Sequence, residues 1–105
     1  MSPGEGFSLV AAADGHFAAR GPLTFDTARR ARELGVRAVA RCAGSALEVA
    51  CGGVTACDSA GLAVLIDWLG AARRAGRTLR YTQLPQGLLA LARISEVEEL
   101  IAPGA

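Results

Sequence analysis

The sequence contains no lysine, a single histidine and only 5% aromatic residues, and these shortages exclude several classes of protein. Without a lysine there is no GxxxxGK[ST] phosphate-binding loop, although Gly52 and Gly53 lie shortly before Asp58 and Ser59. The one histidine, His16, has no serine or cysteine near it in sequence, which is too little for a catalytic triad or a metal centre. We therefore expect no catalytic residues, no metal and no cofactor.

Cysteine, net charge and long apolar runs are also scarce. Cys42, Cys51 and Cys57 are odd in number and have no CxxC spacing, so we expect buried small hydrophobes in a reducing cytoplasm. The 11 basic residues nearly balance the 10 acidic ones, which gives no reason to expect nucleic acid or an anionic membrane as a partner. No apolar run approaches the ~20 residues of a membrane span. Residues 1–6 lack the features of a signal peptide, so we expect a cytoplasmic protein with no direct membrane insertion.

The apolar patterns alternate between strand-like and helix-like periods. A chain of 105 residues with 51% apolar content is long enough for one core, so we expect a single domain over residues 1–105. The expected order is two strands (7–13, 16–20), a helix from about 27 to 44, a strand (47–51), a helix (59–75), a strand (78–83), a helix (85–94) and a short helix or strand (95–101). This alternation predicts an α/β fold, a mostly parallel mixed β-sheet with helices packed on it.

Glycine and proline mark the expected ends of these elements. The Asp14-Gly15 pair predicts a two-residue hairpin turn between the first two strands. The Gly21-Pro22 pair is expected to end the second strand, and Thr24 or Asp26 to cap the first helix. The Gly52-Gly53 pair is expected to give the third strand a flexible exit.

The most informative run is Cys57-Asp58-Ser59-Ala60-Gly61-Leu62, which lies between a strand-like and a helix-like stretch. It places a hydroxyl residue, beside a carboxylate and near a glycine, at the expected start of a helix. Backbone N–H groups are free there and the helix macrodipole is positive. Such a place can hold an anion or carry a phosphoryl group on Ser59. Asp58 or Ser59 is equally an N-cap, which is the more frequent role of these residue types.

The helix that follows this run has two apolar faces. One contains Leu62, Leu65, Ile66 and Leu69, and the nearly opposite one contains Gly61, Val64, Trp68, Ala71 and Ala75. A surface helix normally has one apolar stripe, so the second must be covered by the rest of the domain or by another protein. Tryptophan is a frequent anchor of protein interfaces, so we expect Trp68 and Val64 on a face that is open to a partner. The alternative is that Trp68 packs on the neighbouring helix.

The strand, the glycine-containing loop, the Asp58-Ser59-Ala60-Gly61-Leu62 run, the helix and Gly76 together resemble the STAS domain family, over nearly the whole chain. The resemblance implies a STAS fold, and two subfamilies compete. In bacterial anti-sigma factor antagonists, the residue that matches Ser59 is phosphorylated by a partner kinase. In the second subfamily, the domain is a small cytoplasmic subunit of a phospholipid-trafficking (Mla-type) ABC transporter, where it binds the ATPase subunit.

The sequence is more similar to the second subfamily. The likeness lies in residues 58–69, 71–76, 88–94 and 99–101, whereas the antagonists usually have a second Ser or Thr in place of Ala60 and small residues in place of Trp68. The resemblance therefore implies a non-catalytic regulatory subunit that binds the ABC transporter ATPase of a bacterial lipid asymmetry system, peripheral to the inner membrane. The alternative is an anti-sigma factor antagonist that a serine kinase switches at Ser59. The expected partner-binding residues are Asp58, Ser59, Ala60, Gly61, Leu62, Val64 and Trp68.

Overall fold

The computed structural model describes residues 6–103, and its elements follow the order that the apolar patterns predict. They are β1 (Ser8–Ala13), β2 (His16–Leu23), α1 (Ala28–Arg41), β3 (Ala46–Cys57), α2 (Ser59–Arg74), β4 (Thr78–Thr82), α3 (Gln86–Ile94) and α4 (Glu98–Ile101). The last of these settles the short C-terminal segment as a helix rather than a strand.

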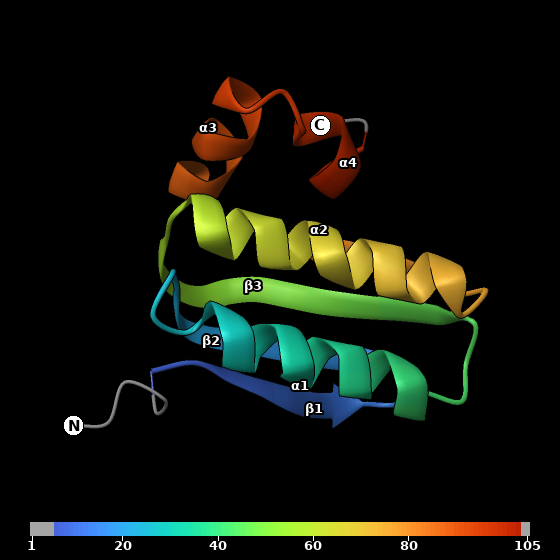
Figure 1. Ribbon diagram of the computed structural model, residues 1–105. Coiled ribbons are helices and arrows are strands. Elements are labelled where there is room, and N and C mark those ends of the chain that lie inside the picture. The colour runs from blue at the N-terminus through green and yellow to red at the C-terminus, as the bar shows by residue number, and fades with distance from the viewer. Residues whose placement is uncertain (1–5, 104–105) are drawn as a thin grey trace.

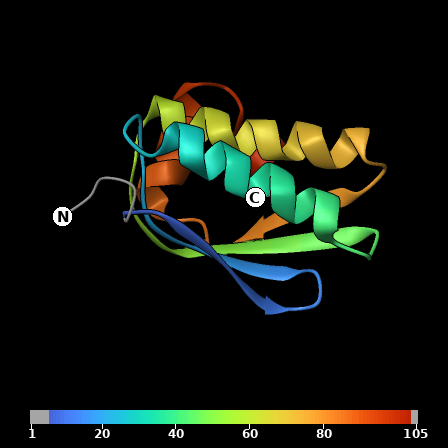
Figure 2. The ribbon, with the colours of Figure 1, turned by 60° about the horizontal axis from the view of Figure 1, so that its bottom comes forward.

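The sheet has the order β1-β2-β3-β4, as Figure 1 shows, with β1 antiparallel to β2 and both other pairs parallel. Parallel neighbours need crossover connections, and α1 and α2 supply them. Both helices lie on the same face of the sheet (Figure 2). Because β2 and β3 are parallel, their carboxyl ends lie at the same edge of the sheet, and α1 and α2 begin there. This is the mostly parallel mixed sheet that the sequence predicts.

The middle of the core is the indole of Trp68, which has 0% exposure. Its Nε1 donates a hydrogen bond to the carbonyl of Ala31 on α1 at 3.2 Å, and its ring lies 6.2 Å from that of Phe7 and 6.5 Å from that of Tyr81. A Cβ on Gly35 would lie 2.0 Å from Nε1, so glycine at this point lets α1 approach the indole. The expectation of an exposed Trp68 is therefore wrong, and the alternative of packing on the neighbouring helix is confirmed.

Two expected strand ends are also wrong, because pairing between strands overrides the local preference of glycine and proline. β2 continues through Gly21 and Pro22, with an irregularity in its register against β3 at that point. β3 likewise continues through the Gly52-Gly53 pair to Cys57. A Cβ on Gly53 would lie 2.9 Å from Cγ of Arg20, so this glycine permits close pairing with β2.

The helix ends agree with the sequence in part. Thr27, rather than Thr24 or Asp26, precedes α1, and its hydroxyl accepts a hydrogen bond from the Thr24 N–H instead of capping the helix. α1 ends at Arg41, before Gly44. α2 ends as predicted, with Gly76 at a φ of 73°.

Candidate functional site

The candidate site is built at the start of α2 by the carboxylate of Asp58. Oδ1 accepts a hydrogen bond from the Gly61 N–H at 3.0 Å, which is the N-cap arrangement. Oδ2 accepts a second hydrogen bond, also at 3.0 Å, from the N–H of Phe25 in the loop before α1. These bonds, with that from Phe25 contributing most, hold the pKa of the Asp58 carboxyl below its usual value. Asp58 is thus ionised at neutral pH and ties the β2–α1 loop to α2.

Gly61 and Leu62 are buried and pack the start of α2 against the rest of the domain. A Cβ on Gly61 would lie 1.8 Å from the carbonyl oxygen of Leu23, so only glycine lets the end of β2 approach the start of α2 this closely. Leu62 is 4% exposed and belongs to the core. Within the motif, Asp58 is therefore a cap whose carboxylate is partly exposed, whereas Gly61 is a close-packing residue and Leu62 a core residue, and both are buried.

Ser59 is the first residue of α2 and is exposed. Asp58, not Ser59, occupies the N-cap position, and among residues 6–103 the Ser59 hydroxyl has no hydrogen-bond partner. Ala60 follows it, half-buried. The hydroxyl is therefore available to a partner or to a modifying enzyme.

Phe25 is the residue at this site that the sequence analysis missed. Its side chain is 80% exposed although its backbone N–H is bonded to Asp58. The available signal was an aromatic residue among turn residues, at a position that neither a strand nor a helix pattern requires. The consequence is an exposed apolar side chain on a backbone that is bonded to Asp58, the neighbour of Ser59 in the chain.

A groove of about 720 Å³ continues from Phe25 between the first halves of α1 and α2. Asp67 and Arg32 form an ion pair across it, with Oδ2 and Nε 3.3 Å apart. Both side chains are about half exposed, so this pair contributes little to stability. Phe25, Ala60 and Ala63 line this groove, and the exposed Ser59 directly precedes Ala60 on α2. We use the name Ser59 surface for these four residues: Phe25, Ser59, Ala60 and Ala63.

Two other expected contact residues lie outside the Ser59 surface. Trp68 is fully buried and Val64 is 3% exposed between the helices, so neither offers a surface to a partner. Their predicted role as direct contacts is therefore incompatible with their burial in this fold.

The residues that carry reactive groups lie apart from one another. His16 pairs with Glu48, with Nδ1 and Oε1 3.5 Å apart, near the start of β3, whereas Ser59 follows its end. Burial, with a smaller effect of the Asp58 carboxylate, raises the pKa of the Cys57 thiol to about 11, so it is neutral at neutral pH. Within residues 6–103, no three side chains of His, Cys, Asp or Glu gather as a metal site would require.

No helix in the part of the chain that the structure describes combines the length and the apolar character needed to cross a membrane.

Comparisons with known proteins concern the family and the fold of the chain. The family model described as "Mlab, STAS domain" matches residues 10–102. The fold is similar to a solved structure titled "Structure of the Anti-Sigma Factor Antagonist SpoIIAA in its Unphosphorylated Form", with a TM-score of 0.70, covering 90% of this chain and 84% of that chain. The identity is 12%, so this likeness concerns the fold alone. A search of curated proteins found no significant sequence match.

Proposed function

The chain belongs to the Mlab STAS domain family, and from this we propose that it is a non-catalytic subunit of a bacterial phospholipid-transport ABC system. It binds the ATPase subunit in the cytoplasm and supports assembly and activity of the complex. Its attachment to the inner membrane is through that complex, with no cofactor of its own. The family assignment and the likeness of residues 58–76 to transporter-associated STAS subunits support this proposal.

The Ser59 surface is the proposed contact with the ATPase. The observation that carries this assignment is the 80% exposure of Phe25, whose backbone is bonded to Asp58, next in the chain to the exposed Ser59. A phenylalanine ring buries roughly 150–250 Å² when it is covered, which is enough for an interface anchor. The small side chains of Ala60 and Ala63 let a partner approach the groove closely.

Asp58 contributes to this contact by positioning. Its two hydrogen bonds hold the Phe25 backbone against α2 before any partner arrives. A surface that is already ordered loses less conformational entropy on binding, so more of the contact energy appears as affinity. Asp58 is thus a positioning residue, whereas Phe25 and Ser59 make the contact.

The test is purification of the tagged protein from its own host at native expression, with identification of bound proteins by mass spectrometry. We expect an ABC ATPase and its permease. Phe25→Ala is expected to reduce recovery of the ATPase at least tenfold while leaving the melting temperature nearly unchanged, because the ring is mostly exposed in the free protein.

Ile94→Ala is the matched control. Ile94 is also 80% exposed, but it lies at the end of α3 and does not line the groove. We expect normal ATPase recovery with this variant. Equal loss with both variants would mean that general surface hydrophobicity, and not the Ser59 surface, is responsible, and recovery of no ATPase at all would contradict the proposed function.

A second candidate is an anti-sigma factor antagonist switched by phosphorylation of Ser59, and the exposed, unbonded hydroxyl favours it. A phosphoryl group adds roughly −1.5 to −2 charges at a helix N-terminus, which the helix tolerates and an apolar partner surface does not. Incubation with the host's anti-sigma kinases and ATP, followed by intact-mass measurement, tests it. An added phosphoryl group that is absent in Ser59→Ala would favour this candidate over the transporter subunit.

A further inference from the structure

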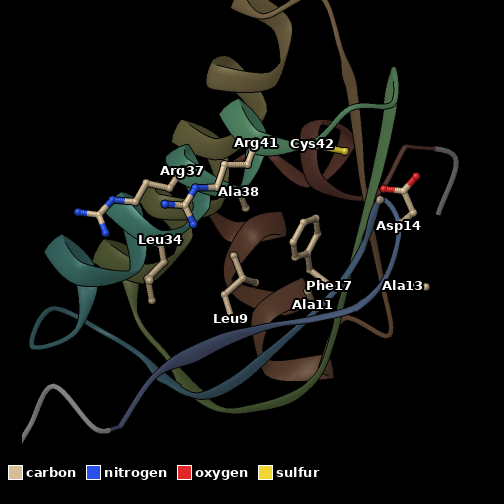
Figure 3. A pocket seen from close by; sticks show the side chains of 11 residues that line it. Leu9, Ala11, Ala13, Asp14, Phe17, Leu34, Arg37, Ala38, Arg41 and Cys42 are labelled. Carbon is tan, nitrogen blue, oxygen red and sulfur yellow. The ribbon is translucent and has the colours of Figure 1, made fainter.

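A second groove lies away from the Ser59 surface, between the β1–β2 hairpin and the second half of α1. Its volume is about 490 Å³, within the range of small-molecule sites. Figure 3 shows the side chains that line it. The strands contribute Leu9, Ala11, Ala13 and Phe17 and the turn between them Asp14, whereas α1 contributes Leu34, Arg37, Ala38 and Arg41, and Cys42 follows its end.

The floor of this groove is apolar because the helix layer does not cover all of β1. Ala11 pairs with Phe17 in the hairpin, and both lie on the face of the sheet that carries the helices. Phe17 is half-buried, but Ala11 and Ala13 are exposed, since the end of the hairpin lies apart from α1 (Figure 2). An apolar strip on the inner face of the sheet is thus left open to solvent.

One rim of the groove is basic. Arg37 and Arg41 are four residues apart on α1, so they lie on the same side of the helix. Figure 3 shows both along this rim, near Leu34 and Ala38, with Asp14 at the opposite end of the groove. Among residues 6–103, no carboxylate lies within 4 Å of either guanidinium group, which is also true of Arg30 and Arg74, but Arg37 and Arg41 line the groove and those two do not.

We propose that this groove binds a single-chain anionic amphiphile, an alkyl chain with a carboxylate or phosphate head. The chain lies on the strip formed by Leu9, Ala11 and Phe17, and the head is held by Arg37 and Arg41. Guanidinium groups bind both kinds of head through paired, charge-assisted hydrogen bonds. The groove is separate from the Ser59 surface, so the proposal stands or falls independently of the proposed function.

A basic rim beside an apolar strip favours a ligand with both an anionic head and an alkyl chain. Free phosphate uses the two arginines but not the apolar strip, and a neutral detergent uses the strip but leaves both guanidinium groups without a counter-ion. Each CH₂ removed from water raises the affinity about fourfold, so an alkyl chain that covers the strip binds much more tightly than the head group alone. The carboxylate of Asp14 at the far end disfavours a second anionic group there.

The experiment is titration of the ¹⁵N-labelled protein with dodecyl phosphate and with laurate, each below its critical micelle concentration, followed by NMR. We expect saturable shifts in the amides of Ala11, Phe17 and Ala38. The double variant Arg37→Gln/Arg41→Gln is expected to weaken binding at least tenfold. Ala11→Glu, at an exposed position that tolerates a larger side chain, is also expected to weaken binding at least tenfold, because it places a negative charge on the apolar strip.

The matched control is Arg30→Gln/Arg74→Gln, which removes the same charge from two exposed arginines that do not line the groove. The dissociation constants of this variant for dodecyl phosphate and laurate are expected to remain within twofold of those of the unaltered protein. An equal loss with this control would show a general charge effect and overturn the proposal.

Three further titrations separate other sources of the same chemistry. Inorganic phosphate that binds the arginines as tightly as dodecyl phosphate would show an anion site without a chain site. Dodecyl maltoside that gives the same shifts and affinity would show that the arginines are not used. Binding only to vesicles containing phosphatidylglycerol, and not to monomeric ligand, would identify a membrane surface as the partner. Each of these results would overturn the proposal.

Discussion

Helices α1 and α2 lie side by side on one face of the same sheet, yet their surfaces differ. α2 is buried along much of its length, with its six buried residues on both of its apolar faces. α1 buries only Ala31, Gly35 and Val39, and its outer side carries exposed arginines. In Figure 1, α2 lies between α1 on one side and α3 and α4 on the other, whereas α1 is at the edge of the layer.

This difference shows that a second apolar face on a helix does not by itself indicate a partner protein. The face that carries Val64 and Trp68 is covered by α1 of the same chain. The apolar side chain left uncovered beside α2 is Phe25, which belongs to a loop. Partner contacts are therefore better sought where burial is incomplete than where apolar periodicity is strongest.

Among the tests of this difference between buried and exposed apolar residues, Trp68→Ala has the largest expected effect. We expect the free energy of unfolding to fall by about 3–5 kcal/mol, because a fully buried indole and its hydrogen bond to Ala31 are lost. Urea unfolding followed by circular dichroism measures this. In contrast, Phe25→Ala is expected to change stability by less than about 0.5 kcal/mol. Similar losses for both would mean that Trp68 is not the centre of the α1–α2 contact.

The next test uses one glycine from each helix. Gly35→Ala on α1 is expected to destabilise by about 1–3 kcal/mol, because its Cβ would meet the Trp68 indole at 2.0 Å. Gly70→Ala on α2 is expected to stabilise by about 0.5–1 kcal/mol, because its Cβ would meet only the end of the Arg74 side chain, at 3.4 Å.

Opposite signs for these two alanine variants would confirm that α1 and α2 are in close contact at Gly35. A stabilising Gly35→Ala would contradict the observed approach of the two helices, since intrinsic helix propensity alone favours alanine at both positions.

The test with the smallest expected effect compares the N-termini of α1 and α2. α2 begins with an ionised side-chain cap, Asp58, and α1 begins with Thr27, which makes no such bond to its helix. We expect Asp58→Asn to lower the free energy of unfolding by about 1 kcal/mol at pH 7, because the asparagine side chain has one oxygen and cannot accept from both Gly61 and Phe25. The folded-state pKa of Asp58 is lower than the usual value of 3.8, so its contribution is complete above about pH 4 and declines as pH falls through the lowered value.

The measurement is the unfolding free energy of both proteins at pH 7 and pH 3. The difference in unfolding free energy between wild type and Asp58→Asn should be smaller at pH 3 than at pH 7. The corresponding difference between wild type and Thr27→Ser should not change with pH. A gap for Asp58→Asn that widens in acid would contradict the assigned pKa direction.

Much of the fold could be predicted because its signals are local. The Asp14-Gly15 turn, the Asp58 cap and the Gly76 helix end depend on the conformational preferences of a few neighbouring residues. The order of the apolar patterns then restricts the chain to a mostly parallel sheet with helical crossovers. The errors at Gly21 and at the Gly52-Gly53 pair arose where strand pairing between distant residues outweighed local preference.

The sequence by itself determined the elements, their order and the position of Ser59 at a helix start. Only the tertiary structure decided which apolar residues are covered: Trp68 by α1, Phe25 by nothing in the described chain, and Ala11 by no helix. The physical reason is that periodicity defines the faces of a helix or strand, whereas burial depends on which elements lie against each face. That is settled by packing between segments far apart in the chain.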